Sequence, residues 1–386
     1  MSPWRPSRLV PLESRSAFLG IFVVTMLGLL AIGATLPVLP TYVKGPLGST
    51  DLAVGIVSGA FAATGLAFRP IAGHLADSRG RRPVVVIGAA MMALAGSLYL
   101  IDLGIPGLIF ARLFLGAGEG MVYTAGAAWV VDLAPPHSRG QIIGLYGISI
   151  WLGLSLGPPI GELLLRASSF DLVWAFAALS PLIGAIIASR LPEPAQAIRG
   201  AREGSLLARE AVAPGIALAL GVVGYAALAA FIVLHLDAEG IGHGGEVFTA
   251  FALTVVAARL FAGSLPDRIG AARCAALMGA IETAGLLAIS VAGSLAVTLL
   301  GAIAMGAAFS LLFPSLAVLV VAQVDESRRG IAMGTFTAFF DIGVGIGSPL
   351  AGAAVGLGGY SAAFAVASIA SIGSMLVALS LRDRIT

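Results

Sequence analysis

The stretch GHLADSRGRR at residues 73–82 decides how this chain is organised, because a second stretch repeats its pattern 190 residues further along. Residues 263–270 read GSLPDRIG, and their glycine, leucine, aspartate and glycine fall in step with those of the first stretch. The same offset relates Arg69 to Arg259 and continues through later glycines. Since the repeat is about half of the 386-residue chain, the sequence predicts two related halves with binding sites between them.

The composition predicts that both halves lie in a membrane. Hydrophobic residues make up 58% of the chain and charged residues 11%, and the mean hydropathy is +1.00, whereas soluble domains carry about 25% charged residues. Apolar runs of about 20 residues, long enough to cross a bilayer, follow one another with short polar breaks. Because the backbone in lipid must satisfy its own hydrogen bonds, these runs are predicted to be helices. The alternating segments of a membrane barrel do not occur in the sequence.

We predict an all-α membrane protein with twelve transmembrane helices, six in each pseudo-symmetric half. The first half is residues 1–191, a cytoplasmic linker follows at 192–212 with a short amphipathic helix near 204–211, and the second half is residues 213–386. The predicted spans are residues 17–43, 51–75, 83–102, 105–133, 140–164, 170–191, 213–236, 246–267, 273–293, 294–322, 331–354 and 361–381.

Positive charge in the loops predicts the orientation. Of the 22 lysine and arginine residues, only Lys44 and Arg166 fall in loops on the side opposite the two termini. Because cytoplasmic loops of membrane proteins collect lysine and arginine, we expect an inner-membrane protein with both termini in the cytoplasm. The net charge of +2 reflects this bias and does not indicate nucleic-acid binding.

Four short motifs resemble those of the major facilitator superfamily. Residues 73–82 resemble its signature between the second and third helices, and residues 108–118 resemble its fourth-helix motif. Residues 153–161 resemble the fifth-helix motif of the drug/proton antiporters, and residues 37–40 resemble the end of the first helix in the same twelve-helix branch. The resemblance implies two six-helix bundles that rock about a central site in alternating access.

A charged cluster is predicted at the cytoplasmic ends of the second to fourth spans. The Asp77 carboxylate can accept N–H bonds from a helix N-terminus, where the dipole is positive, and Arg81 and Arg82 can pair with Asp132. These contacts would lock the cytoplasmic side in one state; the alternative is a tight turn with topology-setting charges. Arg69, at the inner end of the second span, is expected to snorkel or to hold the gate. The other members of the predicted gate are Gly73, Gly80, Asp267 and Gly270.

Two charges lie inside the fourth span and predict the coupling site. A charge at the membrane centre costs at least about 2.5–3.5 kcal/mol unless it is solvated or paired. Arg112 and Glu119 share one helical face, about 10.5 Å apart along the axis, and Tyr123 continues this face towards a wet cavity. We expect Glu119 to carry a proton or bind a cationic substrate; the alternative is a structural ion pair. Asp341, in the eleventh span, is the second candidate proton carrier.

Aromatic side chains are expected to line the substrate cavity, with simple packing as the alternative for each of them. Tyr225 and Phe309 are the strongest candidates, because the resemblance places the seventh and tenth helices at the cavity. The other candidates are Tyr123, Trp151 and Phe313.

Small residues in the fifth span predict a close helix contact. Gly153 and Gly157 leave no side chain in the way of a neighbouring helix, Pro158 bends the span, and Gly161 completes the motif. The resemblance places this seam between the two halves, and ordinary packing within one half is the alternative.

These features lead to one expected function and two alternatives. We expect a secondary transporter that exports a small amphipathic organic molecule in exchange for protons, acts as a monomer and needs no cofactor beyond the proton gradient. The alternatives are an importer of a sugar or other metabolite on the same fold and a non-transporting receptor. An enzyme or ATP-driven pump is not expected, because the sequence has no catalytic constellation and no phosphate-binding glycine loop. Its one cysteine and four histidines have no metal-ligand spacing.

Overall fold

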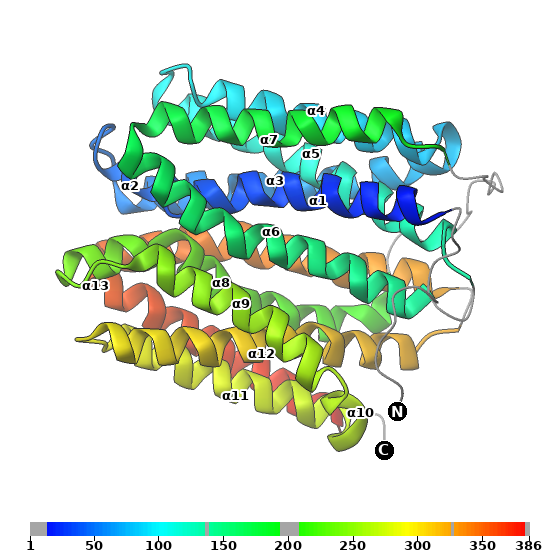
Figure 1. The fold of residues 1–386 in the computed structure, drawn as a ribbon. Helices are drawn as coiled ribbons and strands as arrows, with labels where there is room; N and C mark the ends of the chain where they lie inside the picture. Colours follow the sequence, from blue (N-terminus) through cyan, green and yellow to red (C-terminus); the bar gives the residue numbers. More distant parts are fainter. Residues whose placement is uncertain (1–13, 136–138, 194–207, 326–327, 383–386) are drawn as a thin grey trace. The chain divides into compact units, whose positions relative to one another are not determined.

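The apolar runs form helices in the computed structural model of the chain, which describes residues 14–135, 139–193, 208–325 and 328–382 (Figure 1). Every regular element in these residues is a helix, which confirms the predicted all-α membrane fold. The chain forms two compact units. Unit 1 contains residues 1–35 and 64–202, and unit 2 contains residues 36–63 and 203–386.

Unit 1 is built from five complete helices and the second part of α3. In chain order the elements are α1 (Arg15–Thr35), α3 (Asp51–Arg79), α4 (Arg81–Leu98), α5 (Gly104–Asp132), α6 (Arg139–Ala167) and α7 (Phe170–Arg190). Helix α1 packs on α6 and α7, and α4 packs on α5 and α7. Trp129 of α5 is fully buried in the core of this unit, together with Ile21, Ile142 and Tyr146.

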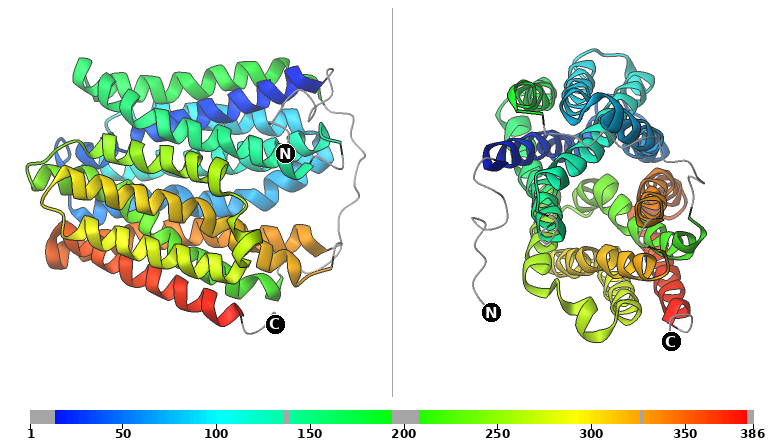
Figure 2. Two further views of the ribbon diagram at one scale, coloured as in Figure 1. Left: turned by 60° about the horizontal axis from the view of Figure 1, so that its bottom comes forward. Right: turned by 90° about the vertical axis from the view of Figure 1, so that its right-hand side faces the viewer.

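Unit 2 contains the first part of α3 and the second half of the chain. Its other elements are α2 (Val38–Lys44), the 3-10 helix η4 (Arg209–Ala211), α8 (Val212–Ala238), α9 (Gly244–Ala262), α10 (Leu265–Ile269), α11 (Ala271–Ser290), α12 (Leu295–Ala322) and α13 (Arg329–Arg382). Helix α8 packs on α13, and α12 packs on α9 and α11. The long helices of each unit run side by side in both views of Figure 2.

The described residues contain eleven helices that are long and apolar enough to cross a membrane. The last of them, Ile331–Leu381, has 51 residues, whereas one crossing needs about 20. Its backbone is non-helical at Gly358 and Gly359, so α13 contains the eleventh and twelfth predicted spans. The described residues therefore account for the predicted number of twelve spans.

Two predicted spans are wrong in detail, and proline explains both. The first span is divided into α1 and α2, because Pro37 has no N–H with which to continue the α1 hydrogen-bond ladder. The eighth span ends at Ala262, and the separate helix α10 follows with Pro266 in its first turn. The amphipathic helix expected near residues 204–211 lies partly outside the described residues, and η4 covers only Arg209–Ala211.

The repeat in the sequence is also a repeat of packing. In unit 1 the α6 residue Gly157 lies against Gly33 of α1, where an added Cβ would come within 2.6 Å of the backbone. In unit 2 the α13 residue Gly347 lies against Val223 of α8, with the added Cβ at 3.1 Å. Gly157 and Gly347 are 190 residues apart, and so are their contact residues Gly33 and Val223. The glycines of the fifth-span motif thus pack on α1 within their own unit.

Candidate functional site

An ion pair lies between two membrane-spanning helices of unit 1. Arg69 of α3 places Nη2 3.6 Å from Oε2 of Glu119 on α5, and the two side chains are 17% and 13% exposed. The Arg69 guanidinium also lies over the Tyr123 ring, 4.9 Å from its centroid. A cation is attracted by the face of an aromatic ring. Arg69 therefore has a carboxylate and a π-face as partners within the membrane-spanning part of the unit.

The close approach of α3 and α5 brings these side chains together. The Thr64 hydroxyl donates a hydrogen bond to the Leu113 carbonyl at 2.7 Å. One turn further along, a Cβ at Gly120 would lie 3.0 Å from the Gly65 carbonyl oxygen, so only glycine fits there without movement. From the sequence alone, Arg69 is expected to snorkel or to hold the gate. Only the packing of α3 on α5 reveals Glu119 as its partner.

Two further side chains extend the polar cluster towards α1. The rings of Tyr123 and Tyr146 are 6.4 Å apart, and the buried Tyr146 hydroxyl is 3.0 Å from the Thr25 hydroxyl. Neither Tyr146 nor Thr25 was identified from the sequence, because an isolated tyrosine or threonine in an apolar run carries no signal. The cluster connects α1, α3, α5 and α6 through polar groups.

Arg112 lies two helical turns from Glu119 on the same helix. Its side chain is buried, and its guanidinium lies beside the Tyr99 hydroxyl. Tyr99 packs against Trp174 with ring centroids 5.0 Å apart. Arg112 therefore belongs to a separate, aromatic environment towards the start of α5.

The equivalent place in unit 2 is aromatic. Arg259, the repeat partner of Arg69, donates from Nη2 to the Ser310 carbonyl at 2.9 Å. The residue at the position of Glu119 is Phe309, whose ring lies 5.4 Å from Tyr225 and 5.8 Å from Phe251. The structure thus brings together the two strongest cavity candidates, Tyr225 and Phe309, which are both buried.

The remaining candidates occupy separate places. Phe313 packs against Phe336, with the ring centroids 5.1 Å apart and the rings tilted. Asp341 is buried in α13 and directly follows Phe340, which packs on Phe309 at 6.2 Å. Trp151 lies half-buried in α6 of unit 1.

A second buried carboxyl lies in the core of unit 2. Glu282 of α11 is fully buried, and its Oε2 accepts a hydrogen bond from the Ser371 hydroxyl at 3.2 Å. Gly221 and Gly224 of α8 leave room for the carboxyl group: a Cβ at Gly224 would lie 2.6 Å from Oε1. These contacts place Glu282 among α8, α11 and α13.

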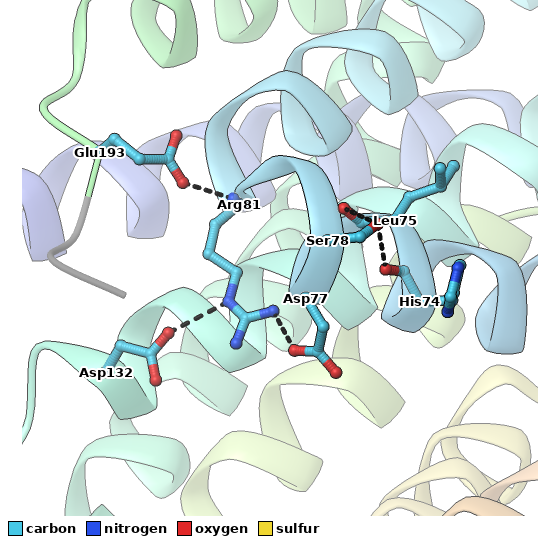
Figure 3. Close-up of polar contacts among 7 residues, drawn as sticks. All are labelled: His74, Leu75, Asp77, Ser78, Arg81, Asp132 and Glu193. Carbon is cyan, nitrogen blue, oxygen red and sulfur yellow. Dashed lines mark hydrogen bonds and ion pairs between the residues drawn. The ribbon is translucent and has the colours of Figure 1, made fainter. Parts of the chain in front are cut away.

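Arg81 is the centre of a charge cluster at the end of unit 1 where α3 and α5 end and α4 begins (Figure 3). Its Nη1 lies 2.6 Å from Oδ1 of Asp77, and its Nε lies 3.1 Å from Oδ2 of Asp132. The Arg81 side chain is 7% exposed, whereas Asp77 is 48% exposed. One buried guanidinium therefore joins α3, α4 and α5, and this planar donor can serve two carboxylates at once.

A third carboxylate caps the start of α4. The Glu193 oxygens accept hydrogen bonds from the backbone N–H groups of Arg81 and Arg82 at 2.5 and 3.0 Å, and Figure 3 shows the first of these. The Arg82 side chain donates to the Leu191 carbonyl at 3.3 Å. A carboxylate at a helix N-terminus satisfies free N–H groups and interacts favourably with the dipole. The sequence predicts such a contact for Asp77, and no sequence signal points to Glu193.

The second copy of the repeated motif, residues 263–270, keeps the glycine turn and lacks the charge cluster seen around Arg81. Gly270 precedes α11 with φ +91°, as Gly80 precedes α4 with φ +101°. Alanines, Ala271 and Ala322, occupy the positions equivalent to Arg81 and Asp132. Asp267 is exposed on α10. At Gly73 of the first copy, an added Cβ would touch only the Thr124 methyl group, at 3.9 Å, among the described residues.

Comparison with known proteins identifies the family. The sequence model described as Major Facilitator Superfamily matches residues 21–246 and 215–385. The chain belongs to the major facilitator superfamily. This major facilitator protein is 33% identical over 376 residues to an uncharacterized MFS-type transporter of Salmonella typhimurium, with 94% of this chain and 96% of the relative covered. It is 34% identical to an uncharacterized MFS-type transporter of Pseudomonas aeruginosa, with 94% and 92% covered.

Solved structures share the fold at low sequence identity. A nucleoside transporter superimposes with a TM-score of 0.80 at 14% identity, covering 94% of this chain and 99% of that one. A D-xylose-proton symporter gives 0.75 at 16% identity, covering 94% and 96%. The human organic anion transporter MFSD10 gives 0.72 at 19% identity, covering 95% and 100%. These structures show the shared fold, and the family match with its transporter relatives makes the protein a multi-pass membrane transporter of the superfamily.

Proposed function

We propose that this transporter exports a small amphipathic organic molecule in exchange for protons, as in the drug/proton antiporter branch. The observation that carries the proposal is the Arg69–Glu119 ion pair within membrane-spanning helices, in which the Arg69 guanidinium also lies over the Tyr123 ring. Ionisable groups in the membrane are costly and are kept mainly where they bind or move charge.

Glu119 is the proposed proton carrier. Its charged form attracts Arg69 across 3.6 Å, and a proton on Oε2 removes that attraction while Arg69 keeps its contact with the Tyr123 ring. The pair is longer than a charge-assisted hydrogen bond of about 2.7–2.9 Å, so a proton or a substrate cation can replace Arg69 at modest cost. Protons drive transport when the conformational states differ in affinity for them.

The two units supply different chemistry at repeat-related positions. Unit 1 has the charged pair, and unit 2 has the aromatic group of Tyr225, Phe251 and Phe309. Aromatic rings attract apolar groups and organic cations, and the charged pair suits a polar or charged group. Asp341, next to this aromatic group, is the second proposed proton carrier, and Arg112 adds a positive charge to the helix of Glu119.

The Arg81 cluster is the proposed cytoplasmic gate element. Asp77 and Asp132 join Arg81 of α4 to α3 and α5, and Glu193 joins its backbone to the start of the linker, so we expect these parts to move as one piece. We place the protein in the inner membrane as a monomer. The arginine-rich loops support an orientation with both termini in the cytoplasm. A reporter fused to the C-terminus tests this orientation by its accessibility from outside.

Direct measurement of proton exchange tests the function. Purified wild-type protein in weakly buffered detergent is exposed to a library of amphipathic compounds, and proton release is recorded beside the Glu119→Gln and Asp341→Asn variants. We expect release in the wild type and its loss in Glu119→Gln. The matched control is Glu162→Gln, because Glu162 pairs with the exposed Arg166 near the end of α6 and lies outside the proposed path.

Flux in inside-out vesicles with an imposed pH gradient separates export from import. Substrate accumulation driven by an acidic lumen supports antiport, whereas accumulation that requires an acidic exterior identifies a proton-linked importer. If a compound binds to the wild-type protein and no proton is released, the proposed coupling is contradicted. Release that persists in Glu119→Gln and disappears in Asp341→Asn moves the proton carrier to Asp341.

A further inference from the structure

A segment from the first half of the sequence packs within unit 2. It consists of residues 36–63, which contain α2, the following loop and the first part of α3. The remainder of α3 belongs to unit 1. Helix α3 thus continues from one unit into the other, and contacts made by its first part hold it to the second half of the chain.

Three polar side chains meet at the start of α3. Lys44 places Nζ 3.0 Å from Oδ1 of Asp51, with side chains 31% and 21% exposed. The Tyr360 hydroxyl donates a hydrogen bond to the same carboxylate oxygen at 3.2 Å. Since Lys44 and Asp51 come from the first hairpin and Tyr360 from the end of the chain, the carboxylate joins two elements 309 residues apart.

The backbone on both sides positions these groups. The Thr50 hydroxyl accepts the Ala53 N–H at 3.2 Å and caps the first turn of α3, which contains Asp51. Tyr360 directly follows the break in α13, where Gly359 has φ +72°, a conformation that glycine adopts without strain. The break turns the chain so that Tyr360 begins the last helical segment beside Asp51.

A seam of small residues continues from this polar contact along α3. Gly55 lies against the Ser348 carbonyl of α13, and a Cβ at Gly59 would lie 3.2 Å from both Ser348 Cβ and the Pro349 ring. From the other side, a Cβ at Gly352 would lie 2.6 Å from the Asp51 carbonyl oxygen. Glycines four residues apart allow helix backbones to approach closely, so α3 and α13 touch without interlocking side chains.

The polar contact is not part of the internal repeat. The positions equivalent to Lys44 and Asp51 are occupied by Leu234 and Ile241, and the position equivalent to Tyr360 by Phe170. All three polar groups are therefore replaced by apolar ones in the other copy. General packing of the fold does not need these groups, because its second copy does without them.

We propose that Lys44, Asp51 and Tyr360 form an outer lock, which holds the first part of α3 on α13 and opens when the transporter exposes its outer side. The 29 residues of α3 span about 43 Å, so Asp51 lies at the membrane face opposite the Arg81 cluster. That this face is the outer one rests on the proposed orientation. Because Lys44 and Asp51 are partly exposed, water can replace their contacts as the glycine seam separates.

Cysteine labelling tests the lock without a known substrate. Cys274 is the single cysteine of the chain, so Cys274→Ala provides a background for Ser348→Cys, a buried reporter in the seam. A membrane-impermeant maleimide is added to intact cells, and the labelling rate is compared between the intact lock and the Asp51→Asn and Tyr360→Phe variants. Arg166→Ala is the matched control, because it removes an exposed ion pair of unit 1.

We expect each lock variant to raise the labelling rate about fivefold, as loss of one partly exposed polar contact predicts, and Arg166→Ala to leave it unchanged. The double variant Lys44→Asp with Asp51→Lys keeps two opposite charges, and we expect it to be labelled more slowly than Asp51→Asn. Unchanged rates in both lock variants, in intact cells and also in inside-out vesicles, with the protein monodisperse, overturn the lock. Acceleration seen only in inside-out vesicles supports the lock and overturns the proposed orientation, and neither result depends on proton coupling.

Discussion

The two turns that carry the repeated motif have the same backbone and different chemistry. Gly80 and Gly270 both have positive φ and both precede a helix. In unit 1 the next residue is Arg81, which bridges two carboxylates. In unit 2 the equivalent residue is Ala271. Glycine therefore determines the shape of the turn. The charge cluster depends on partner residues from other helices, which are present in unit 1.

Removal of Arg81 is the largest expected effect. Arg81→Ala should lower the free energy of unfolding by about 2–3 kcal/mol, below the cost for a fully buried pair because Asp77 is half exposed. It leaves Asp132 without its guanidinium partner. Arg273, exposed in the first turn of α11, is the matched control, and Arg273→Ala should cost less than about 0.5 kcal/mol. Thermal unfolding in detergent, followed by size-exclusion chromatography, measures both; equal losses would contradict the comparison.

The variants Gly80→Ala and Gly270→Ala distinguish the loss of stability from backbone strain from the loss caused by a steric clash. Both variants should lose about 1–2 kcal/mol from the positive φ. At Gly80 the added Cβ would also lie 2.8 Å from the Glu193 carboxylate, whereas at Gly270 it meets no described atom within 4 Å. Gly80→Ala should therefore unfold at a lower temperature than Gly270→Ala. The double variant Gly80→Ala with Glu193→Ala serves as control, since its backbone strain remains while the clash is gone.

The two ends of the linker offer a smaller contrast. Glu193→Gln should cost about 1 kcal/mol, because the amide replaces one of two oxygens that accept N–H groups of α4. Glu210 pairs with Arg328 at 3.2 Å on an exposed surface, and Glu210→Gln should cost less than about 0.5 kcal/mol. The same unfolding measurement compares them. A larger loss in Glu210→Gln would show that the cap on α4 is not the stronger anchor.

Transfer of the charges to unit 2 is the smallest expected effect. Ala271→Arg combined with Ala322→Asp should change stability by less than about 1 kcal/mol, because Ala322 is exposed and surface ion pairs contribute little. Double-mutant analysis of the two single variants isolates the coupling between the new charges. A coupling as large as that between Arg81 and Asp132 would indicate that the turn alone creates the cluster.

The fold was predictable from the sequence to a greater extent than the site. The twelve spans follow from apolar length, and the repeat of glycines and aspartates predicted the matching turns at Gly80 and Gly270. The sequence prediction does not include the break between α1 and α2, because it treats Pro37 as part of the end of the first span and not as an interruption within it. Helical spacing placed Glu119 on a face with Arg112, but such spacing describes only one helix. It contains no information about Arg69 on the neighbouring helix.

The sequence by itself shows that the chain lies in a lipid bilayer, how many helices cross it, and what shape the repeated turn has. The physical reason is local: lipid thickness and backbone hydrogen bonding set the length of each apolar run, and positive φ selects glycine. Only the tertiary structure decided the partners of the charges. Glu193 reaches the backbone of Arg81 across 112 positions of sequence, and Tyr360 reaches Asp51 across 309. Such contacts depend on which helices pack together, and that choice is made by the shape and burial of whole surfaces.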